Sequence, residues 1–306
     1  MPLFALPPGE TPWRVAIVGA GALGTTLALR LHQVGVPIEA VVSRTEASAR
    51  ALAERVCARG GADPRDLLPD SVNTVICCTP DRVVAEVDHL VADARARWAG
   101  ALVVHTSGAL TAAHLPACAA AGAEVASFHP IQTFTKDTHP EAFAGAYVGI
   151  EGEPAALDAC TALALRLGAH PIVVPADQKG TYHLACALAS NYLVTLLHLA
   201  SEALRPIGVD TPTAFRILAP LTDHAVANAR NTTPALALTG PLVRGDLETI
   251  TSHLNALAEH APGRQATYLA LAEETLRMAS HAGRLDASQS DAIRLFLEDR
   301  RRDAKP

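Results

Sequence analysis

The chain has 306 residues, of which 49% are hydrophobic, 18% charged and only 4% aromatic. This length suggests two domains, and the abundance of Ala, Leu and Val suits a buried parallel sheet and closely packed helices. A net charge of -6 argues against a nucleic-acid interface, because such an interface needs a concentrated basic face.

The first half of the chain alternates between short apolar runs and helical stretches. The predicted strands are residues 14–18, 36–42, 73–78, 101–105, 124–129, 147–150 and 171–174. The predicted helices among them include residues 23–34, 46–59 and 154–167. This alternation predicts an α/β fold with a parallel, doubly wound sheet.

The pattern changes after Pro175, beyond which we find no strand candidate. Ala- and Leu-rich helices are predicted at residues 178–206, 211–231, 246–260, 263–282 and 287–302. The fold class is therefore α/β followed by all-α, with a Rossmann domain at residues 1–175 and a helical substrate and dimerisation domain at residues 176–306. Apolar helices with few aromatic residues must bury broad faces, which predicts a homodimer.

The sequence also predicts the compartment. Met1 to Trp13 has no positive charge ahead of an apolar run, so we expect no signal peptide. The six cysteines show neither metal-ligand spacing nor a disulfide ladder, which indicates a reducing compartment and no metal. Leu184 to Leu204 is apolar but carries Asn191 and Glu202, so we expect a buried helix rather than a membrane span. We expect a cytoplasmic protein that does not bind membranes.

A G-x-G-x-x-G motif separates the first predicted strand from the first helix. It consists of Gly19, Ala20, Gly21, Ala22, Leu23 and Gly24. In a dinucleotide-binding turn, the first glycine makes the turn, the second lets the backbone approach a pyrophosphate, and the third lets helix pack on strand. The following helix start offers free N–H groups to the phosphates.

The end of the second predicted strand distinguishes the two nicotinamide cofactors. NAD enzymes usually place an Asp or Glu there to bind the ribose hydroxyls. This chain has Ser43, Arg44 and Thr45 instead, and hydroxyls with a guanidinium suit a 2′-phosphate. We therefore expect NADP, with NAD as the alternative. An exposed loop arginine is the other interpretation of Arg44.

Polar residues follow the next predicted strands at the edge where open α/β sheets bind ligands. Thr79 and Pro80 end the third strand and are predicted to contact the cofactor. Ser107 follows the fourth strand, and His129 ends the fifth. Both lie where a nicotinamide is expected, although Ser107 could instead cap a helix.

The helical half contributes three further candidates. His183 and Asn191 lie on one predicted helix among small residues, and burying them is costly unless they have polar partners. We favour a ligand, with a satisfied core histidine as the alternative for His183. Arg244 lies in a glycine-flanked loop before Asp246, a predicted helix N-cap. Arg244 could bind a substrate carboxylate in bidentate fashion or hold a loop.

The chain resembles a bacterial family of Rossmann-like proteins whose helical C-terminal half is a domain of unknown function, related to the 6-phosphogluconate dehydrogenase superfamily. The matching stretches are Gly19 to Gly24, His105 to Leu110, His129 to Phe134, Tyr182 to Tyr192 and Ala237 to Leu254. The resemblance implies an NADP oxidoreductase without naming its substrate. The Lys-x-x-x-Asn pair of hydroxy-acid dehydrogenases is absent, because His183 stands four residues after Lys179.

These residues lead to one functional hypothesis and one alternative. The hypothesis is hydride transfer between NADPH and a small oxo or imino acid of the ketopantoate type. His183 is the expected general acid, because an imidazole titrates near neutrality, and His129 is the reserve. Asn191 would orient the carbonyl, and Arg244 would bind the carboxylate. The alternative is a dinucleotide-binding sensor or assembly protein without catalysis.

Overall fold

The computed structural model describes residues 13–303, so the expectation of no signal peptide falls largely on residues outside this range. The chain divides into two compact units, Met1–Asn191 and Tyr192–Pro306. The expected domain boundary after residue 175 follows the last strand, whereas the first compact unit also includes the next helix. This boundary therefore stays a prediction.

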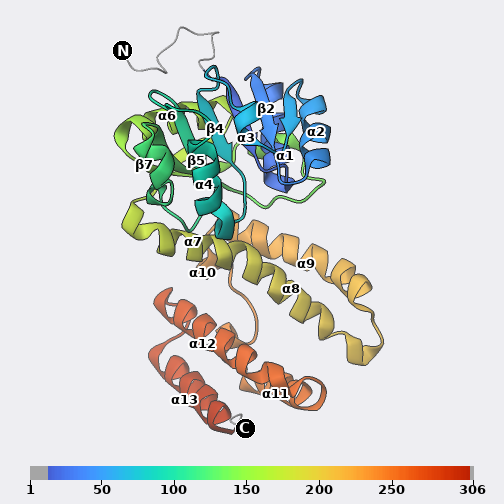
Figure 1. Cartoon of the computed structure of the whole chain (residues 1–306). Helices are drawn as coiled ribbons and strands as arrows, with labels where there is room; N and C mark the ends of the chain where they lie inside the picture. The colour runs from blue at the N-terminus through green and yellow to red at the C-terminus, as the bar shows by residue number, and fades with distance from the viewer. Residues whose placement is uncertain (1–12, 304–306) are drawn as a thin grey trace. The chain divides into compact units, whose positions relative to one another are not determined.

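The first unit contains an eight-stranded sheet with the order β3-β2-β1-β4-β5-β6-β7-β8 (Figure 1). The strands are β1 Val15–Val18, β2 Ile38–Val42, β3 Arg59–Gly61, β4 Thr74–Cys77, β5 Leu102–His105, β6 Glu124–Ile131, β7 Tyr147–Gly152 and β8 His170–Val173. The order 3-2-1-4-5-6 is that of a dinucleotide-binding Rossmann sheet. The predicted fold class is confirmed.

Helices cover both faces of this sheet and enclose two separate cores. One face carries α1 Ala22–Gln33, α2 Glu46–Arg55 and α6 Pro154–Arg166. The other carries α3 Pro64–Leu67, α4 Val84–Ala92 and α5 Pro116–Ala120. Alternate residues of β1 serve the two cores, since Ile17 packs on one face and Val18 on the other. Each fully buried branched side chain contributes about 1.5–3 kcal/mol.

Two features of the sheet differ from the sequence prediction. β7 pairs antiparallel with β6, with His129 opposite Gly149, whereas an entirely parallel sheet was expected. The cause is the connection: only the short turn η3, Pro140–Phe143, lies between β6 and β7, and a parallel crossover needs a longer element. The strand β3 was missed because it is short and ends in Gly60 and Gly61.

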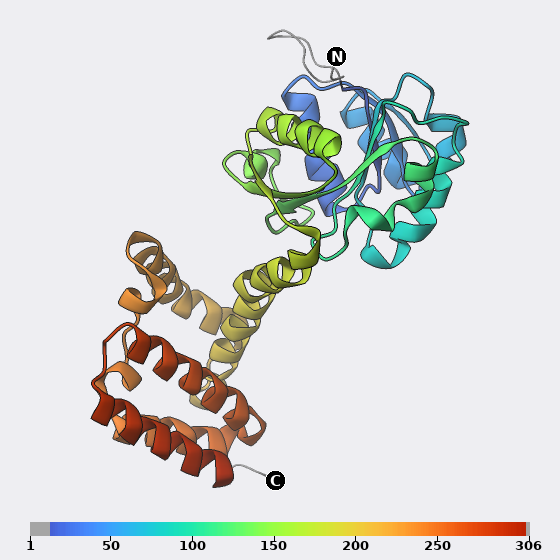
Figure 2. The ribbon, with the colours of Figure 1, turned by 90° about the vertical axis from the view of Figure 1, so that its left-hand side faces the viewer.

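The second unit is helical and has one well-formed core. This core lies among α11 Leu247–His260, α12 Gln265–His281 and α13 Ala287–Asp303, and includes Ile250, Leu276 and Ile293. Figures 1 and 2 show α12 and α13 side by side. The pair α8 Leu193–Glu202 and α9 Thr211–Asn231, followed by α10 Pro234–Ala237, keeps most of its apolar residues exposed.

The helical segment Ala176–Ile207 contradicts one expectation directly. It was expected to be buried in the chain, but only 6% of its most apolar window is buried. By length and composition it is the one candidate membrane span among residues 13–303. It is also not a single α-helix: α7 Lys179–Ala187 runs into a π-helical turn, η5 Leu188–Tyr192, before α8 begins. Such π turns often occur at functional sites.

Candidate functional site

The glycine turn after β1 has the geometry that a dinucleotide requires. Gly19 has a φ of 109°, and a Cβ atom there would lie 2.5 Å from the Cys78 carbonyl oxygen. A Cβ at Gly24 would collide with the Gly19 carbonyl oxygen. At Gly21, by contrast, no atom lies within 4 Å of the Cβ position. The first and third glycines are thus needed for the fold, and the second leaves open space for a ligand.

The start of α1 is suited to an anion. Its N-cap, Gly21, provides no side-chain cap hydrogen bond, and no acidic residue lies in the first turn. The first N–H groups of a helix have no partner within the helix, so they are available to a phosphate. Beside this turn, Thr79 Oγ1 is buried without a hydrogen-bond partner in the described chain. These residues fit a bound dinucleotide, and the orphaned hydroxyl offers it one further polar contact.

The predicted 2′-phosphate segment lies just beyond β2. Arg44 is exposed and forms no hydrogen bond or ion pair with any residue between 13 and 303. The Ser43 amide bonds to the Gly61 carbonyl, which fixes the segment against β3. Thr45 is the N-cap of α2 and makes no side-chain cap hydrogen bond. The guanidinium and both hydroxyls are therefore free to bind a ligand.

Three residues converge at the carboxyl ends of β5 and β6. A Cβ atom at Gly108 would lie 2.7 Å from His183 Cδ2 and 2.9 Å from both Cε1 and Nε2 of His129. The two imidazole centroids are 6.3 Å apart with planes inclined by 72°. Both histidines predicted from sequence thus flank one glycine, beside the loop that follows β5.

His129 is held by its neighbours in the neutral form. Its Nδ1 lies 2.5 Å from the hydroxyl of Tyr182, one residue before His183 on α7. Burial lowers the pKa of His129 to about 4, and the ammonium of Lys179 adds to this effect. Near neutral pH His129 is therefore a neutral imidazole, which donates one hydrogen bond and accepts another.

Lys179 is the most unusual group near these histidines. Its side chain is almost fully buried, and Nζ donates to Ser127 Oγ at 2.7 Å and to the Ser107 carbonyl at 3.3 Å. Ser127 Oγ also donates to the Ser107 carbonyl. Desolvation lowers the pKa of Lys179. The lysine ties α7 to the ends of β5 and β6.

The hydroxyl of Ser107, a predicted catalytic group, belongs to a turn. Ser107 Oγ accepts hydrogen bonds from the amides of Ala109 and Leu110. The Ser107 amide donates to Nδ1 of His105, whose Nε2 contacts the Thr111 carbonyl oxygen. These bonds give Ser107 a clear structural task, which is to shape the loop carrying Gly108.

The remaining predicted residues lie on separate elements. Asn191 lies in the π turn η5 at the end of the first unit. Arg244 is exposed in the turn η7, Leu242–Arg244, of the second unit. Asp246 caps α11 as expected, because its side chain accepts a hydrogen bond from the Thr249 amide. Pro80 is exposed at the start of the turn η1, Asp81–Val83.

Four further residues shape this site, although the sequence analysis assigned none of them a role in it: Gly108, Ser127, Lys179 and Tyr182. One signal was present, because positions 179, 182 and 183 are spaced i, i+3 and i+4 and so share one helix face. Nothing in the sequence shows that this face meets β6. Among the described residues, no group of three or more His, Cys, Asp or Glu side chains could hold a metal ion.

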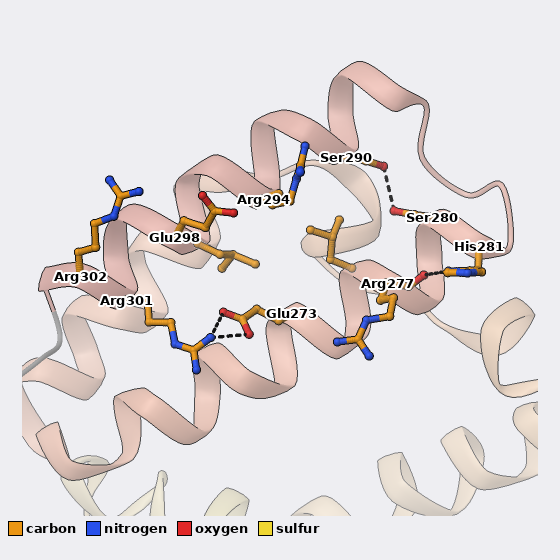
Figure 3. A pocket seen from close by; sticks show the side chains of 11 residues that line it. Glu273, Arg277, Ser280, His281, Ser290, Arg294, Glu298, Arg301 and Arg302 are labelled. Carbon is orange, nitrogen blue, oxygen red and sulfur yellow. Dashed lines mark hydrogen bonds and ion pairs between the residues drawn. The ribbon is translucent and has the colours of Figure 1, made fainter.

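Two hollows lie within the second unit. A groove of about 800 Å³ runs between α12 and α13 (Figure 3). Its four arginines all form ion pairs with acidic residues; they are Arg277, Arg294, Arg301 and Arg302. A cavity of about 980 Å³ between α8 and α11–α12 is mainly apolar.

Comparisons with known proteins agree with this architecture. Residues 10–130 match a Rossmann-like domain, and residues 146–275 match a domain of unknown function, DUF2520. No curated protein matches the chain. A structure of a proposed NADP oxidoreductase from Bacteroides fragilis is 28% identical, with a TM-score of 0.72, and the match covers 86% of this chain and 97% of that one.

Other solved structures share the fold. A protein from Thermotoga maritima is 25% identical with a TM-score of 0.69, over 88% of this chain and 99% of that one. A reductive aminase from Aspergillus terreus, solved with NADPH and ethyl levulinate, is 21% identical with a TM-score of 0.60. That match covers 93% of this chain and 99% of the aminase, and at this identity it describes the fold alone.

Proposed function

We propose a specific reaction for this chain, in which a Rossmann-like domain is joined to a DUF2520 domain. The protein is an NADP-dependent oxidoreductase, as its relative from Bacteroides fragilis is proposed to be. Its reaction is hydride transfer between NADPH and the carbonyl or imine carbon of a small oxo or imino acid.

The observation that carries this proposal is the convergence of His129 and His183 on Gly108 at the carboxyl end of β5. In Rossmann sheets the cofactor binds across the carboxyl ends of the strands, at the point where the strand order reverses. Here that point lies between β1 and β4. A dinucleotide bound by the turn after β1 and extended along this edge reaches the end of β5.

Arg44 supports NADP as the cofactor. An exposed guanidinium with no partner in the described chain, flanked by the Ser43 and Thr45 hydroxyls, suits a 2′-phosphate. No carboxylate occupies the corresponding place at the end of β2, where NAD enzymes bind the ribose.

The chemistry at Gly108 divides between the two histidines. NADPH supplies a hydride to the carbonyl or imine carbon, and the oxygen or nitrogen that gains the electron pair must receive a proton. His183 donates this proton, and neutral His129 donates a hydrogen bond that polarises the acceptor, a role suited to a neutral imidazole. Asn191 orients the carbonyl, and Ser107 holds the loop.

The exposed apolar helices support a homodimer. Val194 on α8 is 64% exposed and Leu221 on α9 is 69% exposed, and other large apolar residues of these two helices are exposed as well. A second copy of the chain, paired through α7–α9, would bury this surface. We therefore favour a cytoplasmic dimer over insertion of Ala176–Ile207 into a membrane, which the polar residues of this helix disfavour.

A His183→Gln variant tests the proposal. We expect the melting temperature and the affinity for NADPH to be unchanged, and turnover on a panel of small oxo acids to fall by roughly 10²–10⁴. His89→Gln, at an exposed position on α4, is the matched control. If the unmodified protein binds NADPH but reduces no compound of the panel, the protein is a dinucleotide-binding sensor or assembly protein instead.

A further inference from the structure

The pair His129 and Tyr182 has a feature that hydride transfer alone does not explain. The phenol hydroxyl contacts Nδ1 of the imidazole, and the rings meet edge to face at an angle of 89°. This leaves Nε2 on the side of Gly108, and no residue in the described part of the chain forms a hydrogen bond with it. One nitrogen is thus engaged by the protein, and the other is available to a ligand.

We infer that Tyr182 is a positioning residue that donates to His129 Nδ1 and so fixes the proton of the neutral imidazole on Nε2, aimed at the oxygen of a carbonyl substrate. This inference rests on the proposed function and refines it. An Nε2–H donor on His129 favours carbonyl substrates over iminium ions. A carbonyl oxygen has lone pairs that accept a hydrogen bond, whereas a protonated iminium nitrogen has none.

The direction of the hydrogen bond follows from the surroundings of the phenol. Burial and the neighbouring Cys186 thiol raise the pKa of Tyr182, so the phenol keeps its proton. The phenol hydroxyl can donate its hydrogen bond either to His129 Nδ1 or to the sulfur of the Cys186 thiol. The imidazole nitrogen is the stronger acceptor, since sulfur accepts hydrogen bonds only weakly. The phenol therefore donates to Nδ1, and His129 keeps its own proton on Nε2.

Burial disfavours the alternative in which both nitrogens are protonated, and the Lys179 ammonium adds to this effect. The ionisable rings His183 and His105 also lower the pKa of His129, whereas Asp81 acts in the opposite sense. The Lys179 ammonium lies 5.6 Å from the centroid of the Tyr182 ring. The same helix, α7, thus supplies both the phenol that fixes the tautomer and a charge that adds to the effect of burial on His129.

Glycine at residue 108 leaves the space that this donor needs. Any Cβ there would lie 2.9 Å from His129 Nε2 and occupy the place where an oxygen acceptor would bind. A neutral Nε2–H in a partly buried site stabilises negative charge as it develops on the substrate oxygen. His129 is therefore the catalytic hydrogen-bond donor, and Tyr182 acts through it.

The test combines nitrogen NMR with kinetics on the full chain. In protein labelled with ¹⁵N-histidine, the His129 signals are identified by their loss in His129→Gln. We expect the Nε2–H tautomer at pH 7, and a mixture of tautomers in Tyr182→Phe. With an oxo acid, kcat of Tyr182→Phe should fall about tenfold while KM for NADPH stays the same.

The control is Tyr268→Phe, which removes a similar contact of 2.9 Å between a tyrosine hydroxyl and Nδ1 of His253 on the second unit. It should leave the His129 signals and turnover unchanged. A second arm uses His129→Gln, whose amide can replace the Nε2–H donor, and His129→Leu, which cannot. The glutamine variant should retain more turnover than the leucine variant.

An imidazolium or an Nδ1–H tautomer of His129 in the unmodified protein would overturn the inference, even if Tyr182→Phe does not fold. An unchanged tautomer in a folded Tyr182→Phe variant would also overturn it. Faster reduction of cyclic iminium compounds than of oxo acids would refute the preference for carbonyl substrates. An Nε2–H tautomer with no turnover on any compound would refute the proposed function while leaving the role of Tyr182 in place.

Discussion

His183 Cδ2 lies 2.7 Å from the position that a Cβ atom would occupy at Gly108, although the two residues come from α7 and from the loop after β5. A methyl group at residue 108 would therefore push the imidazole of His183 and that of His129 apart. The site needs glycine here for close approach and not for a left-handed backbone, because Gly108 is not among the residues with positive φ.

Gly108→Ala should separate catalysis from cofactor binding. We expect turnover to fall by about 10²-fold, because a shift near 1 Å in a catalytic group has this effect, and stability to fall by about 1–3 kcal/mol from overpacking. NADPH affinity should stay the same. Gly180→Ala on α7, where a Cβ meets no atom within 4 Å, is the control. Full activity in Gly108→Ala would contradict the site.

Arg44→Ala tests cofactor choice. Loss of a charge-assisted hydrogen bond to the 2′-phosphate should weaken NADPH binding by roughly 1.5–3 kcal/mol and leave NADH binding unchanged. Arg50→Ala is the control, because Arg50 already pairs with Glu46 across one turn of α2. Fluorescence titration with both cofactors measures the effect. Equal affinities of the unmodified protein for NADPH and NADH would refute the preference.

His129 should make the protein less stable in acid. Its pKa is lowered to about 4 in the folded chain from an ordinary value of 6.5, so between these values the unfolded chain binds more protons. The stability that His129 contributes is present above about pH 6.5 and is lost as the pH falls through 4. With allowance for its partial exposure, the loss should be about 2 kcal/mol.

Urea unfolding at pH 7.5 and pH 4.5 measures this loss. The difference between the two pH values should be smaller in His129→Gln than in the unmodified protein, because glutamine does not titrate. His89→Gln, which changes an exposed histidine, should leave the difference as it is. Equal pH dependence in His129→Gln and the unmodified protein would show that His129 is not held neutral by folding.

The uncovered surface of α8 predicts the oligomeric state. Val194→Asp places a charge on this surface, where Val194 is 64% exposed in the single chain, and should convert a dimer into a monomer in light scattering at micromolar concentration. Leu165→Asp, at a 59% exposed position on α6, should leave the dimer intact. A monomeric unmodified protein, with NADPH present, would contradict the dimer.

The sequence alone determined the features that depend on neighbouring residues. The spacing of Gly19, Gly21 and Gly24 predicted a tight glycine turn between a strand and a helix, and the change of pattern at Pro175 predicted where strands give way to helices. These predictions succeeded because backbone conformation, capping and hydrophobic periodicity are properties of short segments. For the same reason, Asp246 was correctly predicted to cap α11.

Only the tertiary structure decided how distant segments meet. The antiparallel pairing of β7 depends on the path of a connection and not on the strand's own composition. Whether the apolar segment Ala176–Ile207 is exposed depends on what packs against it. Its composition does not decide this, because a buried and an exposed apolar helix can have the same composition. The contact between His129 and Tyr182 joins residues 53 positions apart. Such contacts arise from packing between elements, which no local pattern of residues encodes.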